Sequence, residues 1–354
     1  MRNNYSLLRH NTFGIPAEAR YFAEYASVEQ LQEELQSYYS LCGYTPGKGD
    51  RPRVLHVGSG SNLLFLGDFD GLVLHSAIKG IEVVGQTGEA VLVRVGAGMV
   101  WDDFVAESIQ RGWYGLENLS LIPGEVGASA VQNIGAYGSE VKDFIVRVHL
   151  WDMTEMKPCV KEVEEMAYAY RYSALKSDEL RGRYAVTHVE FRLSLTFQPH
   201  IEYGGLRKAL AERGVAVGAN DGGKLLDAET LRSVIIETRQ GKLPDPSVLG
   251  NAGSFFMNPI VDRALFEALL AQYPDMPHYE VDAERVKIPA GWMIEKSGWK
   301  GRSLGKAGVY EKQALVLVNL GGASGEDIVR LCETVRADVK AKFGVDIHPE
   351  VNFI

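Results

Sequence analysis

Apolar residues recur at helical spacing in several parts of the chain. Residues 27–30 have the Ser-x-x-Gln form of a capping box, and the apolar positions that follow fall on one face, which predicts a first helix. A second capping box begins at Ser324 and opens the last helix, which Gly344 is expected to end. The other predicted helices cover residues 99–110, 228–239 and 261–273.

Short runs of apolar and β-branched residues, mostly bounded by glycine, predict strands between these helices. Strands alternating with a few helices indicate an α+β fold, and we place the main domain boundary near residue 196. Residues 115–138 are rich in Gly, Ala and Ser but show neither helical nor strand period, and such a long irregular stretch is usually functional. The predicted strands cover residues 54–57, 72–75, 81–84, 91–95, 146–151, 185–195 and 314–320.

Composition places the chain of 354 residues among globular proteins. It is 46% apolar and 23% charged, which excludes the disordered and collagen-like classes. A net charge of −9 without a basic block gives no electrostatic footprint for nucleic acid or an anionic membrane. Cys42, Cys159 and Cys332 lie too far apart in sequence for a disulfide framework or a metal motif. No signal peptide or membrane-spanning run is visible, so we expect a cytoplasmic protein.

The common nucleotide and metal motifs are absent from the sequence. No glycine-lysine pair is followed by the hydroxyl residue of a P-loop, and no glycine turn has the third glycine of the Rossmann fingerprint. Histidines and acidic residues show neither zinc nor calcium spacing. A P-loop nucleotidase and metal catalysis are therefore disfavoured, and we expect no metal.

Two stretches of small residues favour a long ligand. Residues 58–62, Gly-Ser-Gly-Ser-Asn, follow a short apolar strand, and their N–H groups could form a cradle for phosphate. Alone, this motif would more often be an ordinary tight turn. Most side chains in residues 122–138 are so small that a flat ring system could lie directly on the main chain. A diphosphate joined to an aromatic end, as in flavin adenine dinucleotide (FAD), fits both stretches.

Further segments carry candidate chemical groups, each with a plainer alternative. Ser254 lies between glycine and two phenylalanines that would exclude water, and it is either a proton donor or a turn hydroxyl. Arg171 lies among three tyrosines, as a carboxylate clamp or a stacked structural residue. Glu350 would act only if buried, because most such acids point to water. Residues 239–246 bring two cations to a rigid loop, which suits diphosphate but also a solvated loop.

Taken together and in order, these segments resemble the UDP-N-acetylenolpyruvoylglucosamine reductase (MurB) family over nearly the whole chain. The specific matches are residues 122–138, Tyr170-Arg171, residues 250–256 and residues 349–351. The resemblance implies an α+β protein: an FAD-binding fold of the vanillyl-alcohol-oxidase type and a separate α+β substrate-binding domain. It implies an FAD-binding domain over 1–196, with lobes of about 1–66 and 67–196, and a substrate-binding domain over 197–354. The tail, about 345–354, would return to the active site.

The resemblance also implies the reaction. NADPH, as co-substrate, would reduce non-covalently bound FAD, which would pass hydride from N5 to C3 of the enolpyruvyl group of UDP-N-acetylglucosamine enolpyruvate. Ser254 would protonate C2 to give UDP-N-acetylmuramate for peptidoglycan precursor synthesis, with Arg171 and Glu350 as the other catalytic residues. The expected partners are small molecules only, with no obligate protein partner. A flavin-dependent alcohol oxidase of the same fold and a non-catalytic nucleotide-sugar binder are the alternatives.

The family's binding positions map onto this chain residue by residue. Tyr203 resembles the tyrosine of the substrate-covering loop in one of the family's subtypes. Asn352 departs from the basic residue that some members carry, and Ser59 replaces a frequent glycine. The positions matching FAD contacts are Gly58, Ser59, Gly60, Ser61, Asn62, Pro123, Gly124, Gly127, Ala128, Asn133, Ile134 and Gly135, and those matching substrate contacts are Tyr170, Tyr203, Arg239, Lys242 and Asn258.

Overall fold

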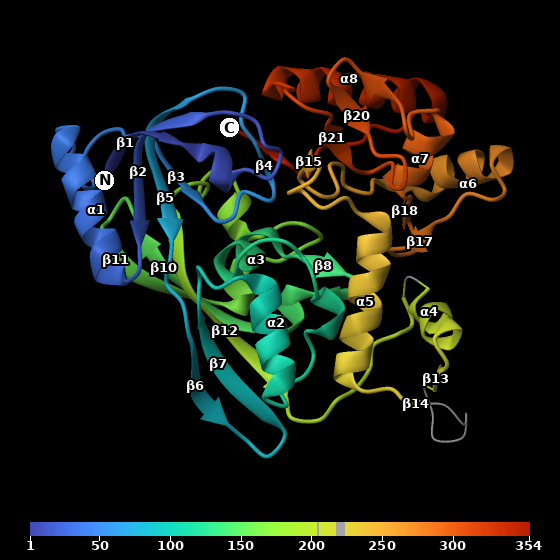
Figure 1. Ribbon diagram of the computed structural model, residues 1–354, viewed down its shortest axis with the longest axis horizontal. Helices are drawn as coiled ribbons and strands as arrows, with labels where there is room; N and C mark the ends of the chain where they lie inside the picture. The colour runs from blue at the N-terminus through green and yellow to red at the C-terminus, as the bar shows by residue number, and fades with distance from the viewer. Residues whose placement is uncertain (204, 217–223) are drawn as a thin grey trace. The chain divides into compact units, whose positions relative to one another are not determined.

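The computed structural model describes residues 1–203, 205–216 and 224–354 (Figure 1). The described chain forms two units, each built from several segments. The first unit consists of Met1–Tyr5, Ala19–Ser59 and Phe69–Gly241, and the second of Ser6–Glu18, Gly60–Asp68 and Lys242–Ile354. These units are compact bodies and are not defined by what they bind, so the predicted functional division at residue 196 stays a prediction.

One sheet of the first unit is covered by the first helix. Its strand order is β1-β2-β5-β3, with β5 parallel to both β2 and β3. The helix α1 begins after Ser27, whose Oγ accepts a hydrogen bond from the backbone of Gln30, and it buries Leu31 and Leu35. The predicted helix and the predicted strands β3 and β5 are confirmed. These elements are β1 (Arg2–Ser6), β2 (Glu18–Tyr25), β3 (Val54–Val57), β5 (Phe69–Ser76) and α1 (Val28–Leu41).

The other large sheet of the first unit is antiparallel, in the order β11-β10-β12-β7-β6. Figure 1 shows α2 and α3 on one face of this sheet. Trp101 and Phe104 of α2 pack there against Phe191, with ring centroids 5.0 to 6.0 Å from it. The elements are β6 (Ile81–Gln86), β7 (Ala90–Gly96), β10 (Ile145–Asp152), β11 (Lys157–Glu162), β12 (Tyr184–Ser194) and α2 (Trp101–Gln110).

The stretch 115–138 is not wholly irregular, and this prediction was wrong. It contains the short helix α3 (Val126–Gln132) and a 3-10 turn at Glu117–Leu119, followed by β8 (Gly135–Ala136), which pairs with β9 (Ser139–Glu140). The small residues of α3 do not alternate between apolar and polar at helical spacing, so the sequence gives no signal for this helix. Close packing requires them, because a Cβ on Gly127 would lie 2.8 Å from the Cβ of Ala97.

The last helix of the first unit, α5 (Ala228–Lys242), is longer than predicted. Residues 240–242, predicted as part of a loop, belong to the final turn of α5, which ends before Pro244. Arg232 on α5 donates to both carboxylate oxygens of Asp102 on α2, at 2.6 and 2.9 Å, and so ties the two helices together. The neighbouring elements are α4 (Leu206–Glu212), β13 (Val215–Ala216) and β14 (Lys224–Leu225).

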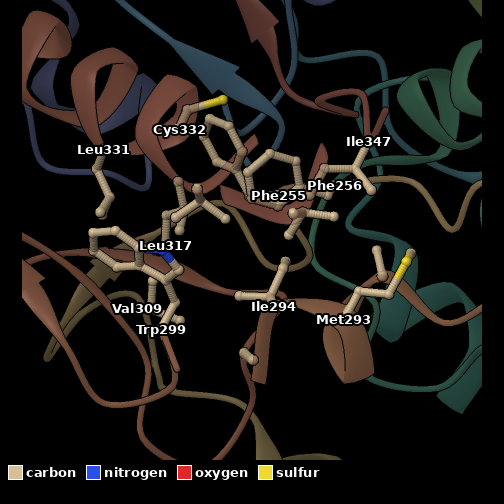
Figure 2. Packing of buried hydrophobic residues seen from close by; sticks show 14 of the residues in the cluster. Phe255, Phe256, Met293, Ile294, Trp299, Val309, Leu317, Leu331, Cys332 and Ile347 are labelled. Atoms are coloured by element: carbon tan, nitrogen blue, oxygen red, sulfur yellow. The ribbon is translucent and has the colours of Figure 1, made fainter. Parts of the chain in front are cut away.

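The second unit has its own hydrophobic core, formed by three helices and two small sheets. Figure 2 shows Phe255, Phe256 and Ile347 in this core, with Cys332 of α8 beside the two rings. The sheets run β15-β21-β20-β19 and β16-β18-β17. The elements are β15 (Gly250–Asn251), β16 (Ile260–Asp262), α6 (Arg263–Gln272), β17 (Tyr279–Glu280), β18 (Arg285–Lys287), α7 (Ala290–Lys296), β19 (Ser303–Leu304), β20 (Ala307–Val309) and β21 (Leu317–Asn319).

The C-terminal helix and tail complete the second unit. The helix α8 (Gly325–Phe343) has the predicted capping box at Ser324 and ends at Gly344 in a left-handed conformation, so both predicted ends are confirmed. The tail then forms β22 (Asn352–Phe353), which pairs in parallel with β4 (Leu63–Leu64). Within the described parts of the chain, no helix is both long and apolar enough to span a bilayer.

Asn319 is expected to be a large single contributor to the stability of the second unit. Its buried amide donates to the carbonyl oxygen of Phe13 at 2.9 Å and accepts from the backbone N–H groups of Gly321 and Ala323. Asn319→Ala removes all three of these hydrogen bonds and leaves the carbonyl oxygen of Phe13 and the N–H of Ala323 unpaired in buried surroundings, so we expect the free energy of unfolding to fall by about 2–3 kcal/mol. Urea denaturation measures it, with the exposed Asn3→Ala as control. Equal stability of the two variants would contradict this reading of Asn319.

Candidate active site

The predicted phosphate turn begins in the first unit with Gly58 and Ser59. Gly58 follows β3, and a Cβ added there would lie 3.1 Å from Oε2 of Glu125 and 3.7 Å from the Cβ of Ala128. The hydroxyl oxygen of Ser59 is buried and has no hydrogen-bond partner within the described chain. A buried polar atom without a partner is costly unless a ligand supplies one.

The turn continues in the second unit with Gly60, Ser61 and Asn62. Gly60 has a φ of +72°, and a Cβ there would lie 1.8 Å from the carbonyl oxygen of His10. The protein's own packing therefore requires this glycine, whatever the turn binds. The side-chain amide of Asn62 donates to the carbonyl oxygen of Glu350 at 3.3 Å. In return, Asn352 donates to the carbonyl oxygen of Asn62 from its backbone and its side chain, at 3.1 and 3.2 Å.

The remaining predicted FAD positions lie in and around α3. Gly127 and Asn133 are buried, and the Asn133 side chain is occupied by protein groups: it donates to the carbonyl oxygen of Ala169 at 2.8 Å and accepts from the backbone of Lys142. Any direct contact of these residues with FAD would have to involve the main chain. The predicted positions that reach the surface of this unit are Pro123, Gly124, Ala128, Ile134 and Gly135.

Arg171 occupies a strained backbone position in the first unit. Ala169 and Tyr172 exchange two backbone hydrogen bonds of 3.1 and 3.0 Å, so Tyr170 and Arg171 form a tight turn in which Arg171 has a φ of 55°. The guanidinium donates to the carbonyl oxygen of Gly135 at 2.9 Å and lies over the ring of Tyr170. Because a residue with a side chain is disfavoured at such an angle, the turn points to a functional constraint.

Side chains from the rest of the unit hold this turn in place. Lys176 donates to the carbonyl oxygen of Arg171 at 2.8 Å, and Ser173 donates to that of Val131 at 2.7 Å. Tyr168 donates to the carbonyl oxygen of Ala130 at 2.9 Å. Sequence reasoning missed Lys176 and the structural use of Asn133, because a hydrogen bond to a distant carbonyl leaves no pattern of spacing.

The guanidinium of Arg239 lies close enough to Arg171 for the two positive charges to repel one another. Burial lowers the pKa of Arg239 below its ordinary value, and the positive charge of Arg171 lowers it too, while Asp102 and Tyr137 act in the opposite direction. Nε of Arg239 is buried without a hydrogen-bond partner in the described chain. Two cations that repel one another are stabilised when an anion binds, so this part of the first unit fits an anionic ligand.

The other predicted substrate residues lie on several elements. In the first unit, the Cβ of Tyr203 would be 3.1 Å from a Cβ on Gly138, so only a glycine lets the Tyr203 segment pack there. Lys242 is exposed at the end of α5. In the second unit, Asn258 accepts from the backbone of Ala290 at 2.9 Å, at the start of α7.

Ser254 and Glu350 lie on neighbouring backbone segments of the second unit. The backbone N–H of Glu350 donates to the carbonyl oxygen of Phe255 at 2.7 Å, and Phe256 forms a bridge with Pro349. Both side chains are half-buried. Phe255 and Phe256 were expected to shield Ser254 from water, but their rings point into the hydrophobic core, as Figure 2 shows, and they anchor the backbone that carries it.

Comparisons with known proteins identify the family to which the chain is similar. A model named FAD binding domain matches residues 26–155, and a model of the UDP-N-acetylenolpyruvoylglucosamine reductase C-terminal domain matches residues 245–354. The chain is 56% identical to UDP-N-acetylenolpyruvoylglucosamine reductase of Bacteroides fragilis, with 100% of both chains covered. It is 43% identical to the reductase of Porphyromonas gingivalis, with 100% of this chain and 99% of the relative covered.

A solved structure shows the same fold. The crystal structure of UDP-N-acetylenolpyruvylglucosamine reductase (MurB) from Thermus caldophilus matches with a TM-score of 0.64 at 21% identity, over 98% of this chain and 96% of that chain. The predicted α+β class, an FAD-binding fold of the vanillyl-alcohol-oxidase type with a separate C-terminal domain, is confirmed. The residues present also fit FAD, because the unpaired hydroxyl of Ser59 and the small residues around α3 are what a diphosphate and a flat ring require.

Gly60 provides a test of the turn. Gly60→Ala forces a Cβ against a carbonyl oxygen at a positive φ, so we expect it to lower the free energy of unfolding by at least about 3 kcal/mol and to lower the FAD content of the purified protein. Thermal unfolding and flavin absorbance measure both effects. Gly67→Ala is the control, because a Cβ there meets open space. Normal stability and flavin content in Gly60→Ala would show that the turn is not built this way.

Proposed function

Because the chain belongs to the UDP-N-acetylenolpyruvoylglucosamine reductase family, and is therefore an FAD-dependent oxidoreductase of peptidoglycan precursor synthesis, we propose the full reaction and the role of each residue. NADPH is the reductant, UDP-N-acetylglucosamine enolpyruvate is reduced to UDP-N-acetylmuramate, and the enzyme acts in the cytoplasm. The observation that carries this proposal is the pairing of a hydroxyl, Ser254, with a carboxyl, Glu350, on hydrogen-bonded backbone of the second unit.

The reaction requires a hydride donor at one carbon of the reacting double bond and a proton donor at the other. FAD, when bound, supplies the hydride that is added at C3 of the enolpyruvyl group. Addition of hydride to an unsaturated carboxylate develops negative charge on that carboxylate and leaves C2 electron-rich. The protein must therefore stabilise an anion and deliver one proton to C2.

Arg171 is suited to stabilise the charge that develops on the substrate carboxylate. Its backbone is held by Lys176, and one end of its guanidinium is already bound to the carbonyl oxygen of Gly135. A charged donor that is held before the reaction spends no energy on reorganisation and contributes roughly 3 kcal/mol to the transition state. Tyr170, whose ring lies under the guanidinium, keeps it oriented toward the substrate.

Ser254 is the proposed donor of the proton to C2. A neutral hydroxyl is a weak acid, but the enolate is basic enough to take its proton, and Glu350 is the third catalytic residue, on the backbone segment beside Ser254. Asn62 holds the carbonyl oxygen of Glu350, and the backbone of Glu350 is bound to Phe255, so the carboxyl group starts from a fixed position.

The nucleotide end of the substrate carries a diphosphate, and cations of α5 are suited to bind it. Arg239 has a buried Nε without a partner in the described chain, and Lys242 is exposed one turn later. Asn258 adds a side-chain amide that donates, because its oxygen is already used by Ala290. Tyr203 covers the bound nucleotide.

Ser254→Ala separates the two halves of the reaction. We expect reduction of the flavin by NADPH to stay normal, and its reoxidation by the enolpyruvyl substrate to slow by at least about 10²-fold, because the proton for C2 is missing. Anaerobic stopped-flow absorbance measures both steps. Ser303→Ala, an exposed serine of β19, is the matched control. Near-normal reoxidation in Ser254→Ala would remove Ser254 from the role of proton donor.

Arg171→Ala is expected to slow the second half-reaction more than the first, because the charge that Arg171 stabilises forms only on the enolpyruvyl substrate. A loss of roughly 3 kcal/mol corresponds to a slowing of about 10²-fold. The same stopped-flow experiment applies, with Arg330→Ala on the exposed face of α8 as control. An equal loss in both half-reactions would instead indicate a defect of the fold.

A further inference from the structure

A charged cluster outside the proposed catalytic residues lies beside the first half of the phosphate turn. His75, at the end of β5, is hydrogen-bonded through Nδ1 to Glu24 of β2 at 3.0 Å and through Nε2 to Glu125 at 2.9 Å. Glu125 is the residue that precedes α3, and its side chain is only 9% exposed. A single imidazole thus bridges two carboxylates, all within the first unit.

The position of Glu125 is unusual for a site that receives an anion. Its Oε2 lies 3.1 Å from the place where a Cβ of Gly58 would be, so the carboxylate rests against the glycine that opens the turn. A carboxylate beside a bound diphosphate is repelled by it, and partial burial increases that repulsion. The site can therefore hold FAD well only if the charge of Glu125 is offset.

His75 is the group that can offset this charge. Burial by itself lowers the pKa of His75, but the hydrogen bonds and charges of Glu125 and Glu24 outweigh burial and raise the pKa above its ordinary value. On β3, the pKa of His56 is lowered to about 4 by burial, so His56 is neutral. Tyr25 of β2, bound to His56 at 2.5 Å, has a pKa raised by burial and is neutral too. Among these described neighbours, His75 is the group whose surroundings favour the positively charged form.

We propose that His75 is a positioning residue for FAD: as an imidazolium between Glu24 and Glu125, it holds the Glu125 carboxylate against Gly58 and offsets its charge, so that FAD is bound more weakly when His75 is neutral. This inference rests on the proposed assignment of residues 58–62 to the FAD diphosphate. FAD adds negative charge near the cluster and so favours the protonated imidazole. Binding is therefore tightest at low pH and weakens as pH rises through the pKa of His75 in the FAD-free protein.

The wild-type holoenzyme gives the first test. We expect the dissociation constant of FAD, from the fluorescence of flavin released on dilution, to rise about tenfold between about pH 6 and pH 9, because the imidazole loses its proton over this range and bound FAD favours the protonated form. A dissociation constant independent of pH over this range would overturn the proposal without any variant.

The variants then separate charge from structure. His75→Asn is expected to raise the dissociation constant about tenfold at pH 6 and to abolish its pH dependence, because the two carboxylates lose their cation. Adding Glu125→Gln to His75→Asn removes the excess charge and should restore affinity to within about threefold of wild type. His278→Asn, an exposed histidine of the second unit, is the matched control.

A merely structural role of His75 would give a different pattern. In that case Glu125→Gln would not rescue His75→Asn, and the double variant would bind FAD as weakly as the single one, which would overturn the proposal. Turnover of the enolpyruvyl substrate by the wild type is measured separately. If turnover is absent while FAD binding depends on pH as described, the proposed reaction fails and this inference stands.

Discussion

The hydrogen bond from the backbone of Glu350 to the carbonyl oxygen of Phe255 is the interaction on which the second half of the candidate site depends. It attaches the C-terminal tail to the segment that carries Ser254, and a few residues later the tail pairs in parallel with β4. Because Phe255 and its neighbour are anchored in the hydrophobic core, the position of Ser254 is fixed by packing. Backbone pairing thus places Ser254 and Glu350 on neighbouring segments before any ligand arrives, as the proposed roles of the two residues require.

In the first unit, hydrogen bonds likewise hold the backbone of Arg171 in place, but in a strained conformation. Its left-handed backbone is disfavoured by about 1–3 kcal/mol, and this strain persists because the side chains of Asn133 and Lys176 bind the carbonyl oxygens of Ala169 and Arg171. The burial of Asn133 is therefore explained by the turn that it supports. The same conformation occurs at other non-glycine residues of the chain, such as Met156 and Ala167, so the proposed role of Arg171 rests on its guanidinium as well as on its backbone.

The sequence pattern predicted the elements that are stabilised by interactions between residues close together in the chain. The helices α1 and α8 begin after serines whose side chains cap the first turn, and they follow a 3.6-residue period, so their N-terminal ends could be predicted. The helix α3 could not, because its small residues are chosen for contact with Ala97 and not for amphipathicity. The last turn of α5 was also missed, because it contains Gly241 and Lys242, which are exposed and add nothing to an apolar period. The residue types of the site followed from the family resemblance, but the bond between Asn62 and Glu350 joins distant parts of the chain and leaves no local signal.

An anaerobic titration of the purified protein tests the proposed reaction most directly. We expect the protein to be yellow, one equivalent of NADPH to bleach the flavin, and UDP-N-acetylglucosamine enolpyruvate to restore the colour without oxygen while one UDP-N-acetylmuramate is formed per flavin. If the colour returned only when oxygen was admitted, or if no lactyl ether appeared, the assignment of Ser254, Arg171 and Glu350 to this reduction would be contradicted.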